Sequence, residues 1–159
     1  MISCTIYDSP VGKLLLTGEG EALTGLWMNA DAPTAVQPGS EGVLRSARKW
    51  LDAYFRGEEP VMDFPLSPKG TEFQRQVWNL LLTIPYGQTR SYGDIAREMA
   101  EIMGKEKMSA QAVGQAVGSN PISIIIPCHR VVGTKGQLTG YAWGIERKKW
   151  LLNHEKERK

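Results

Sequence analysis

A proline- and glycine-rich segment divides this chain into two parts of opposite charge. Glu58–Gly70 contains three prolines and ends in a glycine, and such residues interrupt helices and strands, so the segment is typical of a linker. Residues 1–67 hold five Lys and Arg against nine Asp and Glu, a net charge of −4; residues 68–159 hold 14 against eight, a net charge of +6. We therefore expect two compact halves, 1–67 and 68–159, with the second a candidate for binding a polyanion. A basic half that merely keeps its surface solvated is the alternative.

The composition excludes several classes of protein. No apolar run approaches the roughly 20 residues that cross a bilayer, and the N-terminus lacks the pattern of a signal peptide, so we expect a cytoplasmic chain with no membrane contact. Two cysteines, Cys4 and Cys128, are too few for a disulfide scaffold and fit a reducing compartment. Because residues 1–67 contain one cysteine and no histidine, a set of four nitrogen and sulfur ligands cannot form there, and we expect no metal.

The first half predicts a small antiparallel sheet covered by one helix. Three short segments with strand-like composition are separated by turn signals around Pro10 and Gly18. Apolar residues then recur at helical spacing from Val43 to Phe55. The predicted strands are Ile2–Tyr7, Lys13–Thr17 and Leu23–Met28.

The second half predicts mainly helices. Thr71 with Gln74, and Ser91 with Asp94, each have the spacing of a capping box at a helix start. The helix after Ser91 and the next one are short, and a tight turn containing Gly104 between them would be compatible with a helix-turn-helix. The remaining expected elements are a third helix over Ser109–Val117, a buried strand over Ile122–Ile126, a wing over Val131–Tyr141 and a closing helix over Ile145–His154.

The residues most suggestive of chemistry follow the expected buried strand. Pro127-Cys128-His129-Arg130 places a thiol beside an imidazole and a guanidinium. A free cysteine, with a pKa near 8.5, is only a few per cent thiolate at neutral pH, and a neighbouring base or cation raises that fraction. A buried, inert cysteine is the alternative for an isolated Cys-His pair.

The wider pattern resembles the O6-alkylguanine-DNA alkyltransferases. Pro-Cys-His-Arg-Val stands intact at 127–131, with Asn120 eight residues before the cysteine and Tyr141-Ala142-Trp143-Gly144 after it. The resemblance extends from Phe73 to Glu155 and, more loosely, into the first half. It implies a small ribonuclease-H-like sheet-plus-helix domain followed by a mainly helical domain with a winged helix-turn-helix, an α+β architecture.

The resemblance also implies an activity and roles for individual residues. Cys128 would accept an alkyl group from the O6 position of guanine in DNA, in one irreversible turnover and without a cofactor. His129 would activate the thiol through a water, Glu155 would hold the imidazole, and Asn120 would tie the helix-turn-helix to the reactive segment. From the residues alone, Glu155 could be a solvated tail residue, and Asn120 an ordinary turn or cap residue.

The implied partner is double-stranded DNA, approached from the minor groove with the damaged base flipped out. Tyr92 would help to drive flipping, and Tyr141 would line the base pocket, although both could simply be core aromatics. Gln111 stands where the family commonly has an arginine that fills the gap left by the base, and Trp143 stands where many members have glycine. The indole could narrow the alkyl pocket or be a surface aromatic without effect. The further candidate DNA- or base-contacting residues are Ala110, Ala112, Gly114, Arg130, Val131 and Ala142.

Two alternatives belong to other classes of protein. One is a non-catalytic sensor of alkylation damage or DNA-binding module, against which the intact Cys128 argues. The other is a transcription factor whose alkylated cysteine is the signal, for which the short chain offers no second DNA-binding region. We expect a monomer.

Overall fold

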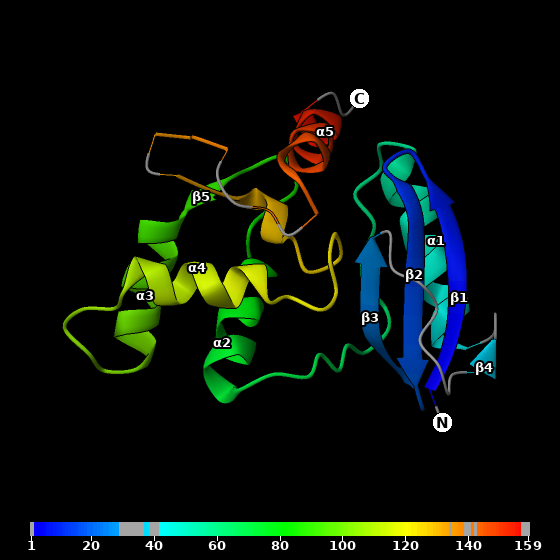
Figure 1. Cartoon of the computed structure of the whole chain (residues 1–159), viewed down its shortest axis with the longest axis horizontal. Helices are drawn as coiled ribbons and strands as arrows, with labels where there is room; N and C mark the ends of the chain where they lie inside the picture. The colour runs from blue at the N-terminus through cyan, green and yellow to red at the C-terminus, as the bar shows by residue number, and fades with distance from the viewer. Residues whose placement is uncertain are drawn as a thin grey trace. The chain divides into compact units, whose positions relative to one another are not determined.

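The computed structural model describes residues 2–28, 37–38, 42–133, 135–138, 141 and 143–156. The chain forms two compact units (Figure 1). The first contains the chain up to Lys69 together with Pro121–Ser123, and the second contains Gly70–Asn120 and Ile124–Lys156. Among the described residues, none of the helices combines the length and the apolar character needed to cross a bilayer.

The first unit is built on a four-stranded sheet in the order β3-β2-β1-β4. β1 (Ile2–Ser9), β2 (Gly12–Glu19) and β3 (Ala22–Met28) are antiparallel neighbours, as the sequence predicts. The short strand β4 (Gln37–Pro38) pairs in parallel with β1 and was not predicted. Two residues contain too little periodicity to indicate a strand, so this pairing depends on contacts distant in sequence.

The outer edge of β3 is occupied by backbone from two later segments. Leu23 pairs with Leu66, and Leu26 pairs with Ile122. The Leu26 N–H donates to the Pro121 carbonyl at 2.9 Å, and the Ser123 N–H donates to the Leu26 carbonyl at 3.3 Å. Three residues that follow Asn120 in the chain therefore belong to the edge of the first unit's sheet.

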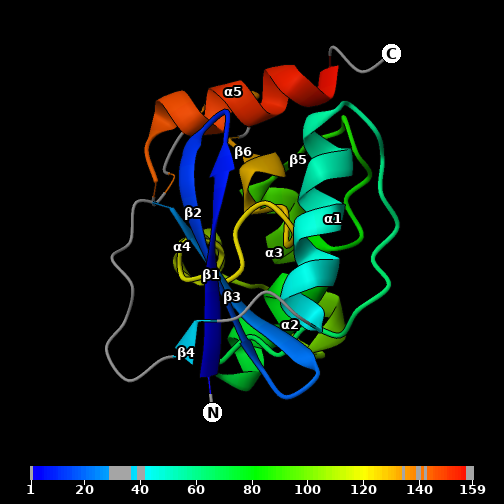
Figure 2. The same ribbon diagram turned by 90° about the vertical axis from the view of Figure 1, so that its right-hand side faces the viewer.

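Helix α1 (Val43–Phe55) lies along one face of this sheet (Figure 2). Its buried side carries five residues at helical spacing, as the periodicity predicts, and Gly18 allows its close approach to β2. A Cβ at Gly18 would lie 2.9 Å from Val43 Cγ1, which is shorter than a normal contact. The register of β2 and β3 shifts at this point, between Thr17 and Gly18. The buried residues of α1 are Val43, Leu44, Ala47, Leu51 and Tyr54.

The second unit contains helices α2 (Glu72–Leu81), α3 (Tyr92–Ile102), α4 (Ala110–Gly118) and α5 (Ile145–Lys156). The first three pack against one another (Figure 1). Both predicted capping boxes are present, at Thr71 with Gln74 and at Ser91 with Asp94. Trp78 is almost fully buried, and its indole N–H donates to the Ala116 carbonyl at 2.8 Å, joining α2 to α4.

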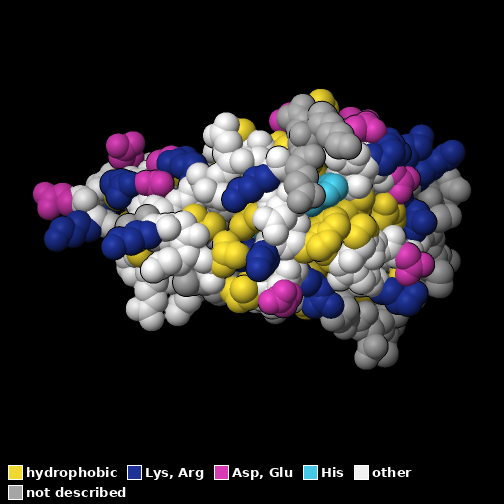
Figure 3. All heavy atoms as spheres, turned by 90° about the horizontal axis from the view of Figure 1, so that it is seen from above, with side chains coloured by type: hydrophobic (Ala, Val, Ile, Leu, Met, Phe, Trp, Pro, Cys, Tyr) yellow, Lys and Arg dark blue, Asp and Glu magenta, His cyan; other side chains and the backbone are white. Residues whose placement is uncertain are grey.

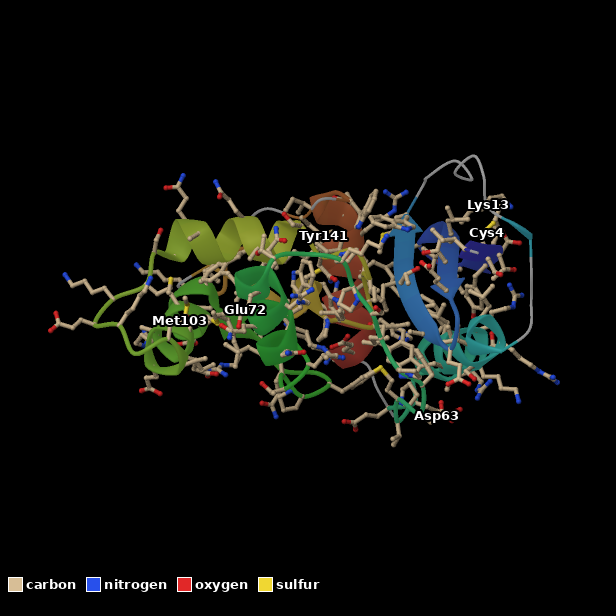
Figure 4. The ribbon with its side chains drawn as sticks, turned by 90° about the horizontal axis from the view of Figure 1, so that it is seen from below. Cys4, Lys13, Asp63, Glu72, Met103 and Tyr141 are labelled. Carbon is tan, nitrogen blue, oxygen red and sulfur yellow. The ribbon has the colours of Figure 1, made fainter. Side chains whose placement is uncertain are left out.

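Two local details differ from the sequence predictions. Seven residues connect α3 to α4, from Met103 (labelled in Figure 4) to Ser109, which is longer than the tight turn containing Gly104 that the sequence predicts. The segment Ile122–Ile126 is a turn with one bridging residue and not a strand. Its β-branched residues favour extended backbone, but a strand also needs a partner along its length, and only Ile122 meets one.

The expected wing is described in part. The Gly133 N–H donates to the Gln137 carbonyl at 2.8 Å, which closes a turn there. Thr134, Thr139 and Gly140, which belong to the same prediction, lie outside the described residues. Before this turn, β6 (Val131–Val132) pairs in parallel with β5 (Arg90–Ser91) and anchors the segment that follows the Cys-His-Arg motif.

The surface charge is less concentrated than the sequence count indicates. Of the 14 cationic residues in residues 68–159, Arg130 and Lys148 are buried, at 8% and 0% exposure. On the face drawn in Figure 3, Lys and Arg side chains are interspersed with Asp and Glu. Two of the positive charges in the half expected to bind a polyanion therefore act on groups inside the protein and not on a partner at its surface.

Candidate active site

The segment that leads from α4 to Cys128 is a compact turn held by two hydrogen bonds. The Asn120 side chain donates from Nδ2 to the Ile126 carbonyl at 2.8 Å, and the Cys128 N–H donates to the same carbonyl at 2.8 Å. Between them, Ile124 is fully buried with a φ of 70°. A β-branched residue in this left-handed region costs about 1–3 kcal/mol and persists only where its surroundings impose it. The turn therefore fixes Cys128 at the start of the short helix η1 (Cys128–Arg130).

Cys128 is buried among groups that act on its thiol in opposite directions. Burial raises the pKa of the thiol above its ordinary value, and this is the largest effect. The Asn120 side chain, the positive charge of Lys148 and the Tyr141 side chain lower the pKa. In the resting protein Cys128 is therefore a thiol, and its conversion to the nucleophilic thiolate requires a base.

His129 is the imidazole next to this thiol, and its Nε2 lies 2.6 Å from Glu155 Oε2. His129 is fully buried, and Glu155 is 2% exposed. Burial lowers the pKa of His129 below its usual value, while the hydrogen bond and charge of Glu155 raise it. Nδ1 of His129 is also buried and hydrogen-bonds to no atom of the described residues. With the Nε2 proton directed at Glu155, Nδ1 carries the lone pair that can accept a proton.

Arg130 points inward, which corrects the expectation that it contacts DNA. Its Nε and one terminal nitrogen donate to the two oxygens of Glu155, at 2.8 and 3.1 Å, and the other terminal nitrogen donates to the Ile84 carbonyl at 2.8 Å. The guanidinium also lies 5.6 Å from the centre of the Tyr86 ring. The Gly87 N–H donates a further hydrogen bond to Glu155 Oε1 at 3.1 Å. The guanidinium of Arg130 is therefore occupied by contacts inside the protein.

The pKa of Glu155 follows from the same contacts. Burial alone would raise the pKa of this carboxyl, but the hydrogen bonds and charges of His129 and Arg130 hold it well below its usual range. Glu155 is therefore a carboxylate at neutral pH, and its alternative interpretation as a solvated tail residue is wrong.

Lys148 is a site residue that the sequence analysis missed. It is fully buried, and its Nζ lies 5.8 Å from the centre of the half-buried Tyr92 ring. Burial lowers its pKa below the usual value, and the nearby Cys128 opposes this shift. A usable signal was its spacing in α5: Lys148, Leu151, Leu152 and Glu155 stand at i, i+3, i+4 and i+7, and all four are buried. In the sequence Lys148 stands between two other basic residues, Arg147 and Lys149, and its residue type does not distinguish it from them.

The candidate DNA-contacting residues of α4 lie on its outer side. Ala110 and Gln111 are exposed, and Ala112 and Gly114 are half-buried. Ser109 caps the helix by accepting a hydrogen bond from the Ala112 N–H at 3.1 Å. Gly114 faces Tyr92, since a Cβ there would meet that ring at 3.9 Å. The side chains on this side of α4 are uncharged, and all but Gln111 are small. Gly114 lies next to the Tyr92 ring, which in turn lies near Lys148.

The other candidate pocket residues have different surroundings. Val131 is fully buried in β6, which leaves its backbone as the group that could meet a base. Tyr141 is half-buried, and its side chain acts on Cys128 to lower the pKa of the thiol. Trp143 is half-buried, and its carbonyl accepts a hydrogen bond from Arg147 at 2.9 Å. Ala142 lies outside the described residues.

Comparison with known families gives two matches that together span most of the chain. Residues 2–68 match the ribonuclease-like domain of 6-O-methylguanine DNA methyltransferase, and residues 72–157 match the DNA-binding domain of the same protein. The first match corresponds to the predicted sheet-plus-helix part, and the second contains Cys128, His129 and Glu155.

Curated relatives are similar along almost their whole length. The chain is 48% identical to the methylated-DNA–protein-cysteine methyltransferase of Mycobacterium tuberculosis strain H37Rv, with 99% of this chain and 94% of the relative covered. It is 46% identical to the protein of the same name from Methanosarcina acetivorans, with 94% and 96% covered.

Solved structures show the same fold. The crystal structure of the M. tuberculosis O6-methylguanine methyltransferase superimposes with a TM-score of 0.88 at 47% identity, covering 100% of this chain and 95% of the other. A structure of the M. tuberculosis protein in complex with DNA gives a TM-score of 0.86 at 47% identity, covering 98% and 94%. The predicted α+β architecture is confirmed.

Proposed function

The chain belongs to the O6-methylguanine DNA methyltransferase family, and we propose that Cys128 is the residue that receives the methyl group. The protein repairs O6-methylguanine in DNA by direct reversal, as a methylated-DNA–protein-cysteine methyltransferase. The observation that supports Cys128 is its contact set: a buried thiol with hydrogen-bonding partners, next to a histidine held by a buried carboxylate. Cys4, the other cysteine (labelled in Figure 4), lies in β1 of the first unit.

The first step is removal of the thiol proton. A water between Cys128 Sγ and His129 Nδ1 passes the proton to the imidazole, whose Nε2 proton stays on the hydrogen bond to Glu155. The Glu155 carboxylate stabilises the resulting imidazolium and keeps the ring in the tautomer that has Nδ1 as acceptor. The Asn120 and Tyr141 side chains stabilise the thiolate, since both lower the pKa of the Cys128 thiol.

The second step is methyl transfer. The Cys128 thiolate attacks the methyl carbon in line with the bond to O6; a carbon–sulfur bond forms, the carbon–oxygen bond breaks, and its electron pair remains on guanine. The proton that left the thiol balances the one that guanine regains at N1. The carbon–sulfur bond of S-methylcysteine is not cleaved to regenerate the thiol, so each protein molecule reacts once. The reaction needs no cofactor.

The substrate we propose is double-stranded DNA entered from the minor groove, with the alkylated guanine flipped out. The small, uncharged outer side of α4 suits close approach to a groove, and Gln111 at its exposed start would occupy the space that the base leaves. Tyr92 and Lys148 lie beyond Gly114, where they would meet the extruded nucleotide.

Mass spectrometry tests the assignment of the acceptor. After reaction with an O6-methylguanine duplex, the intact protein should gain one methyl group, and peptide mapping should place it on Cys128. Cys128→Ser should gain none while still binding the duplex, and Cys4→Ser should react like the parent. Methyl transfer by Cys128→Ser would falsify the assignment, and a parent protein that binds damaged DNA without gaining mass would instead be a sensor.

A further inference from the structure

The Glu155 carboxylate is shared by three residues and not by His129 alone. Oε2 accepts from His129 Nε2 and from Arg130, and Oε1 accepts from Arg130 Nε and the Gly87 N–H. Four donors occupy its two oxygens, and all the side chains involved are nearly inaccessible to solvent. The negative charge that His129 meets is therefore already paired with a positive one.

This pairing matters because the proton acceptor must be uncharged before the reaction. A carboxylate 2.6 Å from an imidazole, if unopposed in a buried site, strongly favours the imidazolium. An imidazolium has no lone pair at Nδ1 and could not accept the thiol proton. The charged groups that face His129 are Glu155 and Lys148 from α5 and Arg130 from η1, and both cations oppose the carboxylate. Arg130 is the one that bonds the carboxylate itself.

We propose that Arg130 is a positioning residue of the methyl-transfer site, whose guanidinium neutralises Glu155 so that His129 rests as an uncharged imidazole. Arg130 touches neither substrate nor sulfur in this scheme and acts only through Glu155. The inference rests on the proposed function, because His129 needs to be uncharged only if it accepts the proton of the Cys128 thiol. The bidentate geometry and the third contact to the Ile84 carbonyl fix the guanidinium in this place.

A purely structural role for Arg130 is the competing explanation. In that case the guanidinium would only fasten the Ile84–Gly87 segment to α5, and its loss would lower stability and activity at every pH alike. An electrostatic role instead predicts a change in the protonation of His129, which two substitutions can separate. Arg130→Lys keeps the charge and loses the two-nitrogen contact with Glu155, whereas Arg130→Gln loses the charge and can still form hydrogen bonds.

The experiment follows both histidines by NMR as pH is varied, in the full-length protein without DNA. His154→Gln assigns the two signals. In the parent, His129 should titrate below the ordinary value of about 6.5. In Arg130→Gln its midpoint should rise by about one to three pH units, and the acidic limb of the single-turnover methyl-transfer rate should move upward with it. Arg130→Lys should restore most of the lower midpoint. Lys149→Gln, which removes an exposed charge from α5, the helix that carries Glu155, should leave the His129 midpoint in place.

The possible results distinguish an electrostatic role of Arg130 from a structural one. An unchanged His129 midpoint in Arg130→Gln, with slower transfer at all pH values, would overturn the proposal in favour of the structural role. If Arg130→Gln does not fold, the comparison moves to the double variant that also carries Glu155→Gln and so leaves no buried unpaired charge. Because this variant replaces a neutralised pair with an uncharged one, its His129 midpoint should stay close to that of the parent; a midpoint well below the parent's, as the loss of an unopposed carboxylate would give, would overturn the proposal. Because these titrations need no methyl transfer, failure of the proposed function would show separately, as a parent protein that gains no methyl group.

Discussion

Asn120 donates a 2.8 Å hydrogen bond from its side chain to the backbone carbonyl of Ile126, across the turn that precedes Cys128. Both residues are buried. The bond closes the turn that contains Ile124 in its left-handed conformation, and the same amide also hydrogen-bonds to the Cys128 sulfur. One side chain thus connects the end of α4 to the reactive thiol.

Replacement of Asn120 should therefore affect stability and chemistry together. Asn120→Ala leaves the buried Ile126 carbonyl with one partner fewer, and we expect a loss of about 1–3 kcal/mol in the free energy of unfolding. Methyl transfer should slow as well, because the thiolate loses a donor. Urea unfolding and single-turnover rates measure the two effects. The neighbouring Ser119→Ala, which removes an exposed hydrogen bond to the Gln115 carbonyl, is the matched control; equal results for both variants would contradict the role of Asn120.

Lys148 should favour reactivity at the expense of stability. Lys148→Met has similar volume and removes the buried charge whose desolvation disfavours folding, so we expect the free energy of unfolding to stay the same or rise. The Cys128 thiol should nevertheless react more slowly with iodoacetamide at neutral pH, because its thiolate loses the positive charge that stabilises it. Peptide mapping confirms the labelled cysteine. A Lys148→Met protein whose Cys128 reacts as fast as the parent would show that this charge does not act on the thiol.

Gln111→Arg should speed repair in duplex DNA if extrusion of the base limits the rate. Arginine carries a charge that the narrow minor groove attracts, and each 1.4 kcal/mol gained in the flipped state is worth about tenfold in rate. Single-turnover repair of an O6-methylguanine duplex measures this gain.

Two controls separate extrusion from other effects of Gln111→Arg. Reaction with the free base O6-methylguanine, which needs no flipping, should be unchanged. Gln115→Arg adds the same charge at another exposed position one turn further along α4, and it should give a smaller gain. Equal duplex rates for Gln111→Arg and the parent would mean that glutamine already fills the space adequately.

Stability should decline as the pH falls below neutrality, through His129 and then Glu155. The pKa of His129 is lowered on folding, so the unfolded chain binds the extra proton first, and stability is lost as pH falls below the unfolded value of about 6.5. Glu155 also has a lowered pKa, which adds a further loss below about pH 4.5. Urea midpoints between pH 8 and 4 measure the curve. His129→Gln should flatten its upper part, whereas His154→Gln should not; a midpoint independent of pH in the parent would contradict the sign of both shifts.

Local sequence determined much of the fold because the forces involved act within a few residues. Thr71 with Gln74 and Ser91 with Asp94 start helices at the predicted positions, since a capping box needs only its own first turn. The periodicity of α1 likewise identified its buried side. For the site, the Cys-His-Arg motif marked Cys128 and His129 without any knowledge of the fold.

Tertiary structure decided whatever depended on partners distant in the chain. Ile122–Ile126 has strand-like composition, but only Ile122 finds a partner on β3, and the Asn120 side chain holds the Ile126 carbonyl within a turn. Arg130 and Lys148 have the charges of surface residues, yet both are buried: Arg130 is bonded to Glu155, 25 residues away, and Lys148 lies near the thiol of Cys128. Burial and ion pairing are properties of the assembled core, so the electrostatics that control the reactive thiol emerged only with the fold.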